Sequence, residues 1–450
     1  MVSILEFMHS MVWGAPSLIL ILGVGLYLSI RTGFVQIRWF PKALRLFLRR
    51  ILNRDVSNGI SPFQALCTAL AATVGTGNLA GVAGALAIGG PGAIFWMWVC
   101  AVLGMGTKYA EATLAVRYQH KSSSEGFSGG PMYMITRGLG DQWKPLALTY
   151  SFFGVVAAFG VGNCTQINAV VSGIHSVASM FGWNMGRCMD LGIGLFLGAL
   201  IVMMLLGGAG SIGRIAERLV PAAALVYILL AFGVLIFRFE HIPEAFSKII
   251  HGAFTPRAAT GGVIGSVLQS LRVGVSRGVF TNEAGMGTAS IAHGCAEVDH
   301  PSEQGMMGMM EVFLDTIVIC TLTALVILVS GIPIPYGMDE GLALTTRAFS
   351  NVYGSWASIV IALETGCFAF ATVLGWGLYG AKCAEFIFGK GIWKQFAWLQ
   401  GVTVVFGALL NTGTVWMISE IVNGLMSLPN LIALVLLSPE LVRLTKQYPA

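Results

Sequence analysis

Charged residues are scarce in this sequence. Its 26 Lys and Arg and 21 Asp and Glu make up only 10% of 450 residues, whereas 56% are apolar. Soluble domains are about 25% charged, so this chain has too few charges to cover a water-facing surface of its size. The mean hydropathy of +0.78 agrees with this conclusion. The composition excludes a soluble enzyme and predicts that most of the outer surface faces lipid.

Motifs for metal, hydrolytic or nucleotide chemistry are missing as well. The eight Cys stand singly, without a CxxC pair or a His at metal-ligand spacing, and we interpret them as small buried apolar residues. The absence of HExxH, GxSxG and paired-aspartate motifs argues against an intramembrane enzyme. The absence of a Gly-x4-Gly-Lys-Ser/Thr string argues against an ATP-driven pump. The net charge of +5 comes without a basic run interleaved with aromatics, so nucleic acid is not an expected partner.

Long apolar runs are abundant. Eleven of them reach roughly the 20 residues that a helix needs to cross a membrane. They cover residues 11–30, 63–88, 92–115, 147–172, 189–207, 219–237, 262–292, 307–331, 355–380, 396–413 and 414–437. The first run is preceded by Glu6 and by no Lys or Arg, so it is expected to be a retained span rather than a signal peptide. The predicted fold class is therefore an all-α polytopic membrane protein with about 11 transmembrane helices.

Basic residues are unequally divided between the two sides of these spans. Nineteen fall in the loops around residues 31–54, 108–144, 214–218, 382–394 and 443–446, and five fall on the other side. Since basic loops stay in the cytoplasm, we expect the N-terminus outside and the C-terminus inside a cell membrane. Residues 39–52 and 240–250 are expected to form surface helices, and the basic face of the first is either solvated or laid on lipid.

Two of the runs are interrupted by closely spaced Gly and polar residues. The second reads Gly-Thr-Gly-Asn at 75–78, and the seventh reads Phe-Thr-Asn-Glu-Ala-Gly-Met-Gly at 280–287. The two breaks are five spans apart, so the second enters the membrane the opposite way up, which is typical of an inverted repeat. We predict one transporter domain over residues 1–450. It consists of an extra helix and basic segment (1–60), a first five-helix repeat (61–238) and a second five-helix repeat (262–437).

Broken helices survive inside a membrane only where their free backbone groups line a protected cavity. Free N–H groups favour an anionic group and free carbonyls favour a cation, so two opposed breaks suit a free amino acid together with sodium. Helix packing would explain the glycines, but it does not explain Asn78, Asn282 and Glu283 at mid-depth. A channel would need a polar stripe along several spans, whereas the polar residues here gather near mid-depth.

Longer strings carry a family resemblance. The string Gly-Gly-Pro-Gly-Ala-Ile-Phe-Trp-Met-Trp-Val at 89–99, preceded by Ala-Thr-Val-Gly-Thr-Gly-Asn-Leu-Ala-Gly-Val-Ala at 72–83, resembles the alanine or glycine:cation symporters, also called sodium:alanine symporters. The strings at 280–287 and Phe-Leu-Asp-Thr at 313–316 match later motifs of that family, and the likeness runs from about Trp13 to Pro439. It implies a LeuT-like 5+5 fold with one extra N-terminal helix, an inner-membrane location, and uptake of alanine or glycine with sodium.

The resemblance also implies where ligands bind. The substrate carboxylate is expected at the backbone N–H groups of Thr76 and Gly77 and at the Asn78 side chain, with Gln166 lining the pocket. The substrate ammonium is expected at carbonyls around Phe280, Thr281 and Glu283. Sodium is expected at the carbonyls of Ala71 and Val74 and the hydroxyl of Thr372. The residue types themselves suggest that Trp376 and Phe280 either close the pocket over a small side chain or, as is commoner for aromatic residues in membrane helices, belong to the core.

The chain departs from the family pattern in the ninth span. Phe370-Ala371-Thr372 has one hydroxyl residue where many members have two, and the stretch at 375–381 lacks a second Tyr and a Glu. Both departures concern the choice and affinity of the ion.

Several charges fall inside spans and need partners. For Asp315 and Arg277 we predict an ion pair with each other, with a role in ion coupling or gating as the alternative. Glu283 is expected to partner Arg272 or Arg277, or else to carry a proton or neighbour sodium. Glu111 and Glu364 need partners that the sequence does not identify.

These observations predict a sodium-coupled symporter for a small neutral amino acid that works by alternating access, with no organic cofactor and no obligatory protein partner. The alternatives are proton coupling, or a larger neutral substrate such as glutamine.

Overall fold

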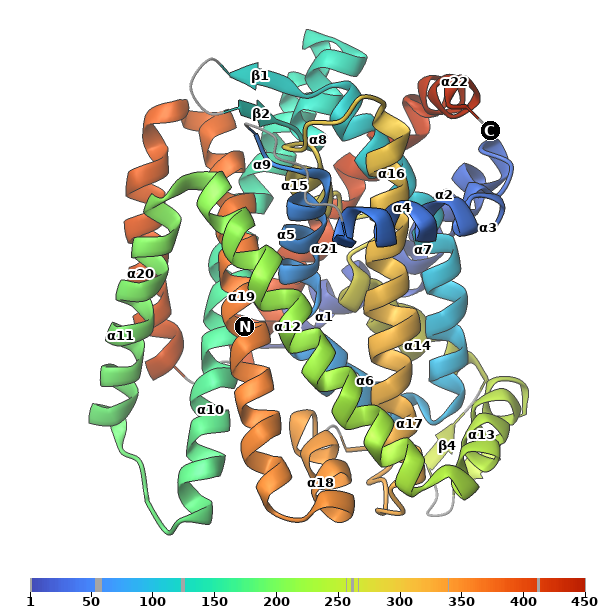
Figure 1. The fold of residues 1–450 in the computed structure, drawn as a ribbon, viewed down its shortest axis with the longest axis vertical. Helices are drawn as coiled ribbons and strands as arrows, with labels where there is room; N and C mark the ends of the chain where they lie inside the picture. Colours follow the sequence, from blue (N-terminus) through green and yellow to red (C-terminus); the bar gives the residue numbers. More distant parts are fainter. Residues whose placement is uncertain are drawn as a thin grey trace.

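The structure is a computed structural model that describes residues 2–52, 59–122, 126–255, 257–259, 263–265, 267–338, 340–410 and 413–449. It is a bundle of long helices that run along the long axis of the molecule (Figure 1). The helices that form most of this bundle are α2 (Ala15–Arg31), α7 (Gly92–Arg117), α9 (Lys144–Phe159), α10 (Thr165–Met180), α11 (Arg187–Leu206), α12 (Gly208–Phe237), α16 (Pro301–Val312), α19 (Trp356–Phe388), α20 (Trp393–Leu409) and α21 (Gly413–Leu436).

Several helices continue through π-helical turns, and shorter elements join them. The π-helical segments are η1 (Gly77–Gly81), η2 (Met134–Leu139), η4 (Gly160–Cys164), which joins α9 to α10, and η6 (Phe313–Cys320), which joins α16 to α17 (Thr321–Val329). The shorter helices are α1 (Val2–Val12), α3 (Val35–Arg38), α4 (Phe40–Leu52), α5 (Pro62–Thr73), α6 (Val82–Gly89), α8 (Pro131–Tyr133), η3 (Asp141–Trp143), η5 (Phe239–His241), α13 (Ile242–Phe254), α14 (Val267–Asn282), α15 (Thr288–His293), α18 (Leu342–Tyr353), η7 (Lys390–Ile392) and α22 (Ser438–Gln447). Two antiparallel hairpins complete the described chain: β1 (His120–Ser122) with β2 (Gly126–Ser128), and β3 (Arg257–Ala259) with β4 (Val263–Gly265).

The all-α membrane class predicted from the sequence is confirmed. Among the described residues, eight helices are long and apolar enough to cross a membrane, and the pair α5 and α6, bent by 54° at its break, makes a ninth. The two other expected spans correspond to α14 with α15, which a five-residue break separates, and to α20, which has 17 residues. Both are helical but are not among those nine, so the count of eleven stays a prediction.

The two broken helices lie side by side. The first half of one, α5, packs against the second half of the other, α15, and α6 packs against α14 (Figure 1). This pairing of halves means that the two helices run in opposite directions, as the predicted inverted repeat requires. The boundaries of the two repeats stay a prediction.

Local sequence explains where α5 begins. The Ser61 hydroxyl accepts a hydrogen bond from the Gln64 N–H at 3.1 Å, and the Gln64 side chain accepts one from the Ser61 N–H at 3.2 Å. This capping box satisfies two N–H groups at the helix start, and Pro62 follows at the first helical position, where no N–H is needed. The helix that leads to the first break is therefore anchored at its end.

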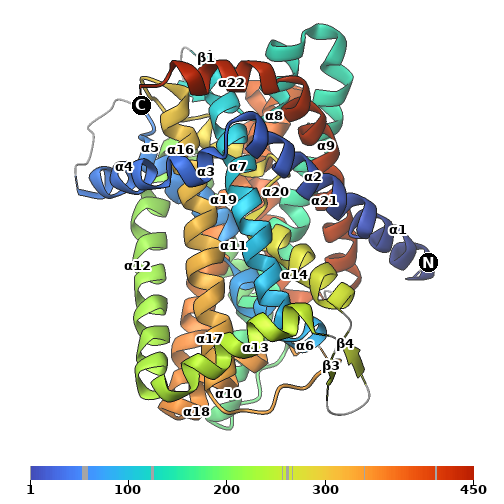
Figure 2. The ribbon, with the colours of Figure 1, turned by 90° about the vertical axis from the view of Figure 1, so that its right-hand side faces the viewer.

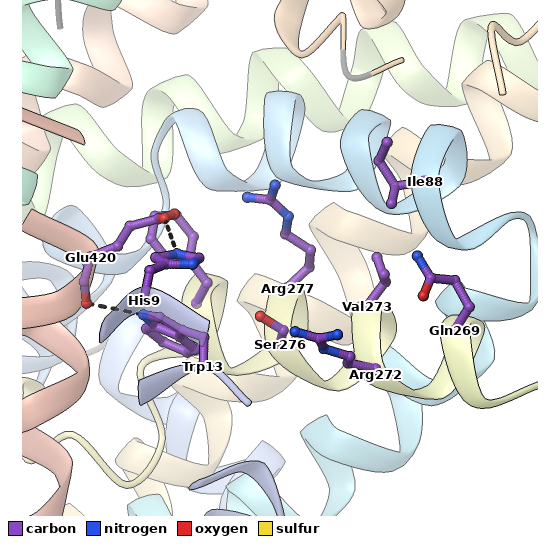
Figure 3. Close-up of a pocket in the computed structure, with 10 residues that line it drawn as sticks. His9, Trp13, Ile88, Gln269, Arg272, Val273, Ser276, Arg277 and Glu420 are labelled. Carbon is purple, nitrogen blue, oxygen red and sulfur yellow. Dashed lines mark hydrogen bonds and ion pairs between the residues drawn. The ribbon is translucent and has the colours of Figure 1, made fainter. Parts of the chain in front are cut away.

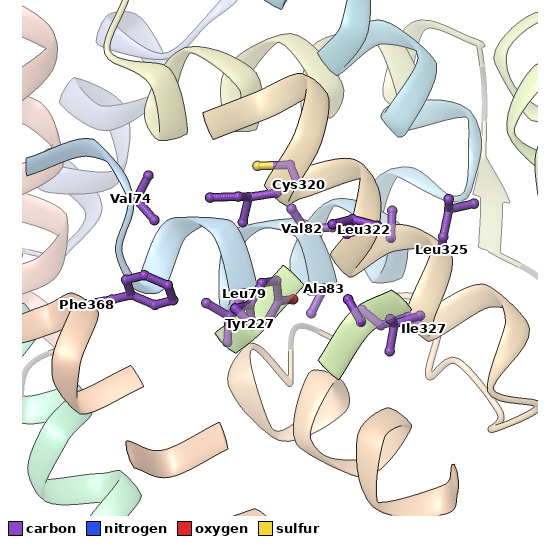
Figure 4. Packing of buried hydrophobic residues seen from close by; sticks show 14 of the residues in the cluster. Val74, Leu79, Val82, Ala83, Tyr227, Cys320, Leu322, Leu325, Ile327 and Phe368 are labelled. Carbon is purple, nitrogen blue, oxygen red and sulfur yellow. The ribbon is translucent and has the colours of Figure 1, made fainter. Parts of the chain in front are cut away.

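The half of this broken helix that follows the break packs in a large apolar cluster. Leu79, Val82 and Ala83 lie among side chains that come from the neighbouring helices, including Tyr227 of α12 and Phe368 of α19 (Figure 4). All five are nearly or fully buried. The packing fixes the position of the backbone just after the break.

Two expected surface helices are confirmed as helices. Residues 39–52 include α4, which lies across the bundle near the C-terminal helix α22 (Figure 2), and residues 240–250 fall in η5 and α13. Several of the basic residues counted as loop residues lie inside helices instead, and two of these are buried. Lys108 is fully buried in α7 and Lys382 is 2% exposed in α19, where acidic partners satisfy them. The unequal distribution of the remaining basic residues is unaffected.

The predicted burial of the cysteines holds for most of them. Cys67, Cys100, Cys164, Cys295, Cys320 and Cys383 are buried, Cys367 is partly buried and Cys188 is exposed. All eight are free thiols.

Candidate substrate and sodium site

The first break frees two carbonyl oxygens. In a continuous helix the Gly75 N–H would bond to the Ala71 carbonyl, but here it donates to the Asn78 Oδ1 atom at 2.9 Å. Likewise the Asn78 N–H donates to the Gly75 carbonyl at 3.3 Å rather than to that of Val74. The carbonyls of Ala71 and Val74, the two expected to hold sodium, have therefore lost their helical donors.

Thr372 of α19 lies directly against this break. A Cβ atom built on Gly75 would be 2.8 Å from the Thr372 Oγ1 atom, and one built on Gly375, a turn later in α19, would be 2.9 Å from the Ala72 nitrogen. The Thr372 hydroxyl donates to the Phe368 carbonyl at 2.9 Å, which leaves its oxygen lone pairs available to a cation. The structure thus places Thr372 beside the break that contains Ala71 and Val74, and the sodium site itself stays a prediction.

Gln166 of α10 reaches the same break. Its Oε1 atom accepts a hydrogen bond from the Thr76 hydroxyl at 3.3 Å, and its Nε2 atom donates to the Val161 carbonyl at 3.2 Å within the π-helical turn η4. Because a π-helical turn shifts the helix register, it changes the direction in which the Gln166 side chain points. Gln166 and Thr76 therefore lie together as expected.

Asn78 has a different environment from the one expected. Its Nδ2 atom donates to the Asp315 Oδ1 atom at 2.6 Å, and its Oδ1 atom accepts from Gly75. The side chain is fully buried, and its polar atoms are already used. These contacts make Asn78 a positioning residue that fixes the shape of the break and leave neither of its side-chain polar atoms for the expected contact with a substrate carboxylate.

Asp315 connects the two breaks. Its Oδ2 atom accepts from the Thr316 hydroxyl at 2.8 Å, which in turn accepts from the Asn282 side chain at 3.2 Å. The predicted ion pair between Asp315 and Arg277 is wrong, because Asp315 faces the first break from η6 whereas Arg277 lines a cavity on the outside of α14. The sequence could not distinguish these two directions because it does not show the π-helical register of η6.

The second break is a short loop in left-handed conformations. Glu283 has φ +53°, Gly285 +93° and Gly287 +78°, and such values favour glycine strongly. The carboxylate of Glu111 in α7 accepts from the N–H groups of Gly285 and Gly287 at 3.0 and 3.1 Å and from the Asn430 side chain at 2.7 Å. The unidentified partner of Glu111 is therefore the backbone of the second break.

The Glu283 side chain is hydrogen-bonded to a residue at the end of its own loop. Its Oε2 atom accepts a hydrogen bond from the Thr288 hydroxyl at 2.6 Å, at the first residue of α15. The expected pairing with Arg272 or Arg277 is wrong, since the left-handed backbone at Glu283 turns its side chain toward α15. Glu364 of α19 is 7% exposed, and its carboxylate makes no hydrogen bond or ion pair with any residue that the structure describes.

The two breaks touch each other at Gly77. A Cβ atom built there would lie 3.3 Å from the Thr281 Cγ2 atom and 3.6 Å from the Phe280 ring. Trp376, by contrast, packs against Gly162 of η4 and stacks edge-on to Tyr379, with ring centroids 5.7 Å apart. Phe280 and Thr281 are thus directly at the first break, while Trp376 is part of the surrounding core.

A polar cavity of about 250 Å³ lies beyond Phe280, and the sequence analysis did not find it. Arg272 and Arg277 of α14 line it opposite Glu420 of α21 (Figure 3). Glu420 binds the His9 ring at 2.7 Å and accepts through its carbonyl from the Trp13 indole at 3.0 Å. The extra N-terminal helix therefore contributes to this cavity, and no sequence motif indicates that contribution.

A second network was also missed. The buried Lys108 ammonium binds Glu311 at 3.0 Å, and Glu311 binds the His293 ring at 2.9 Å. His293 is bound in turn by Gln304 at 2.6 Å. These charges satisfy one another between α7, α15 and α16, as charges inside a membrane protein must.

Comparisons with solved structures define the fold. The fold is similar to that of MhsT in complex with L-phenylalanine, with a TM-score of 0.57 and 14% identity over 87% of this chain and 98% of that one. It is also similar to a manganese transporter of Eremococcus coleocola, with a TM-score of 0.52 and 13% identity over 85% and 77%. These identities support the fold alone. The chain has the LeuT-like transporter fold.

Sequence comparisons define the family. The model of the sodium:alanine symporter family matches residues 1–450. The chain is 43% identical to the sodium/alanine symporter AgcS of Methanococcus maripaludis, over 99% of this chain and 97% of that protein. It is 41% identical to an uncharacterized transporter of Haemophilus influenzae, over 99% and 96%, and 37% identical to the probable sodium/glutamine symporter GlnT of Bacillus subtilis, over 98% and 89%. The protein belongs to the sodium:alanine symporter family.

Proposed function

We propose that this protein is a secondary symporter, not an enzyme, that couples inward sodium movement to the uptake of a small neutral amino acid such as alanine or glycine. The observation that carries the proposal is the geometry of the first break, which contains two carbonyls without helical donors and against which the Thr372 hydroxyl lies. Sodium is a hard cation that prefers oxygen ligands, and the name of the relative AgcS includes sodium and alanine.

In this proposal the two breaks hold the substrate between them. The N–H groups of Thr76 and Gly77 face its carboxylate at the start of a half-helix, where negative charge is favoured. Carbonyls at Phe280, Thr281 and Glu283 face its ammonium. Gln166 holds the Thr76 hydroxyl and so orients the carboxylate side of the site.

The close approach at Gly77 supports a small substrate. With Thr281 and Phe280 within 3.3 to 3.6 Å of a Cβ atom there, little room is left beside the break. Phe280 also separates the break from the polar cavity of Arg272, Arg277 and Glu420. We therefore place substrate entry at that cavity and assign Phe280 the role of closing the site, while the two repeats rock to open it on the other side.

Sodium coupling supplies enough energy for this task. One cation that moves down about 100 mV gains about 2.3 kcal/mol, and a tenfold sodium gradient adds about 1.4 kcal/mol. Together these support roughly 500-fold accumulation of a zwitterion at a one-to-one ratio. The protein would sit as a multi-pass protein in the inner membrane, with its N-terminus outside and its C-terminus in the cytoplasm.

The test is uptake of radiolabelled alanine into proteoliposomes with an inward gradient of sodium, of protons or of neither. Uptake that needs sodium, and that glycine competes strongly while leucine and glutamine compete poorly, is the expected result. Uptake driven by the proton gradient alone would overturn sodium coupling. Stronger competition by glutamine than by glycine would favour the larger substrate suggested by the name of GlnT. Protein-free liposomes are the control for leak.

A further inference from the structure

A second, larger cavity lies away from the breaks, between α10, α11, α12 and α19. Helices α11 and α12 diverge from the turn that joins them at Gly207, and α10 and α19 lie behind the gap (Figure 1). The cavity measures about 920 Å³, and its walls include Val170 of α10, Leu219 of α12 and Phe370 of α19. It lies within the size range of about 300–1,000 Å³ for sites of small molecules.

Two arginines line this otherwise apolar cavity. Arg214 and Arg218 are four residues apart in α12, so they lie one above the other on the helix face that Leu219 and Ala222 continue. Both are exposed, and neither makes a hydrogen bond or ion pair with any residue that the structure describes. The cavity therefore combines an apolar interior with two positive charges that have no counter-ion among the described residues.

The depth of these arginines in the membrane follows from the sequence of α12. Residues 219–237 contain no charged side chain, and at 1.5 Å per residue they span about 28 Å. The hydrocarbon core of a bilayer is about 30 Å thick, so Arg218 lies at the boundary where lipid headgroups begin. The unequal distribution of basic loops places this boundary on the cytoplasmic side.

We propose that this cavity binds one anionic phospholipid of the cytoplasmic leaflet, with its phosphate between Arg214 and Arg218 and an acyl chain along the cavity wall formed by α10 and α19. Two guanidinium groups offer paired donors to phosphate oxygens, and basic pockets between membrane helices recognise anionic headgroups. A headgroup with net negative charge neutralises both arginines better than a zwitterionic one. The proposal does not depend on which amino acid is transported.

The test compares binding of dioleoyl phosphatidylglycerol and dioleoyl phosphatidylethanolamine to the purified, delipidated full chain by native mass spectrometry. We expect one tightly bound phosphatidylglycerol, and at least about tenfold weaker binding of it to the variant R214Q/R218Q, since hydrogen bonds between charged groups are lost. The matched control R187Q/R238Q removes two positive charges from the opposite side of the membrane and should bind the lipid like the unmodified protein.

A cavity-filling variant tests the acyl-chain site independently of charge. A Cβ atom built on Gly366 meets no atom within 4 Å, so Gly366→Phe can project into the cavity without a clash and should displace the lipid while both arginines remain. Unaltered phosphatidylglycerol binding in R214Q/R218Q and in Gly366→Phe would overturn the proposal. So would equal binding of the two lipids, or an equal loss in R187Q/R238Q. Monodisperse elution and an unchanged Tm show that each variant is folded.

Discussion

The Asn78 side chain donates a hydrogen bond to the Asp315 carboxylate at 2.6 Å, although the two residues are 237 positions apart in sequence. The same carboxylate accepts from the Thr316 hydroxyl, which accepts from Asn282, so one acidic residue in η6 is linked directly to the first broken helix and through Thr316 to the second. Because all these groups are buried, a change at either break must be accommodated by the other. In the proposed function, this connection is a physical route by which sodium at the first break influences the second.

The first prediction concerns this connection. Asn78→Ala and Asp315→Ala should each weaken alanine binding by roughly 10-fold or more, because each leaves a buried polar group without its partner. The double variant should be no worse than the worse single variant, since both substitutions remove one shared interaction. Alanine affinity measured by isothermal titration at saturating sodium checks this. Losses that simply add in the double variant would show that the two residues act separately.

The presence of both breaks could be predicted from the sequence, whereas their internal contacts could not. Closely spaced Gly and polar residues inside apolar runs give the position of a break directly, and the family motifs indicate which backbone groups lie there. The direction of a buried side chain depends on local helix register. In the part of the chain that the structure describes, four π-helical segments shift that register, and η6 turns Asp315 toward Asn78 rather than toward Arg277.

Long-range partners were also beyond sequence reasoning. Glu111 was recognised as a buried charge in need of a partner, but its partners are backbone N–H groups of a loop 174 and 176 residues away. Every residue except proline carries the same backbone N–H group, so residue types do not indicate which of these groups bind a buried carboxylate. The contact of Glu420 with His9 was missed for a related reason, because it depends on how the extra N-terminal helix packs against α21.

The second prediction concerns sodium. Thr372→Val should raise the sodium concentration for half-maximal uptake several-fold, because it removes a hydroxyl oxygen beside the freed carbonyls of Ala71 and Val74. Thr372→Ser keeps that oxygen and should stay near normal. The control Thr365→Val removes a buried hydroxyl of the same helix that also donates four residues back, at 2.7 Å to Ile361. An equal shift in Thr372→Val and Thr365→Val would place the ion elsewhere.

The third prediction concerns space at the first break. Gly77→Val should abolish alanine uptake, because a branched side chain there would press on Thr281 and Phe280 and fill the approach to the backbone N–H groups. Gly81→Ala is the matched control, since a Cβ atom at that position has only Thr281 Cγ2 near it, at 3.9 Å. Uptake rates are compared at equal reconstituted protein. Normal transport by Gly77→Val would mean that the substrate binds away from this break.

The fourth prediction concerns the stability of the second break. Glu111→Ala leaves the Gly285 and Gly287 N–H groups and the Asn430 amide without their common acceptor, and each such loss costs about 1–3 kcal/mol. We expect a clear fall in Tm for the detergent-purified protein. The fall should be smaller for Glu111→Gln, which keeps one acceptor oxygen. Glu364→Gln is the comparison, because that carboxylate has no hydrogen-bond partner among the described residues, and it should leave Tm unchanged or raise it. If Glu111→Ala lowered Tm no more than Glu111→Gln does, the hydrogen bonds of Glu111 would contribute nothing to holding the loop.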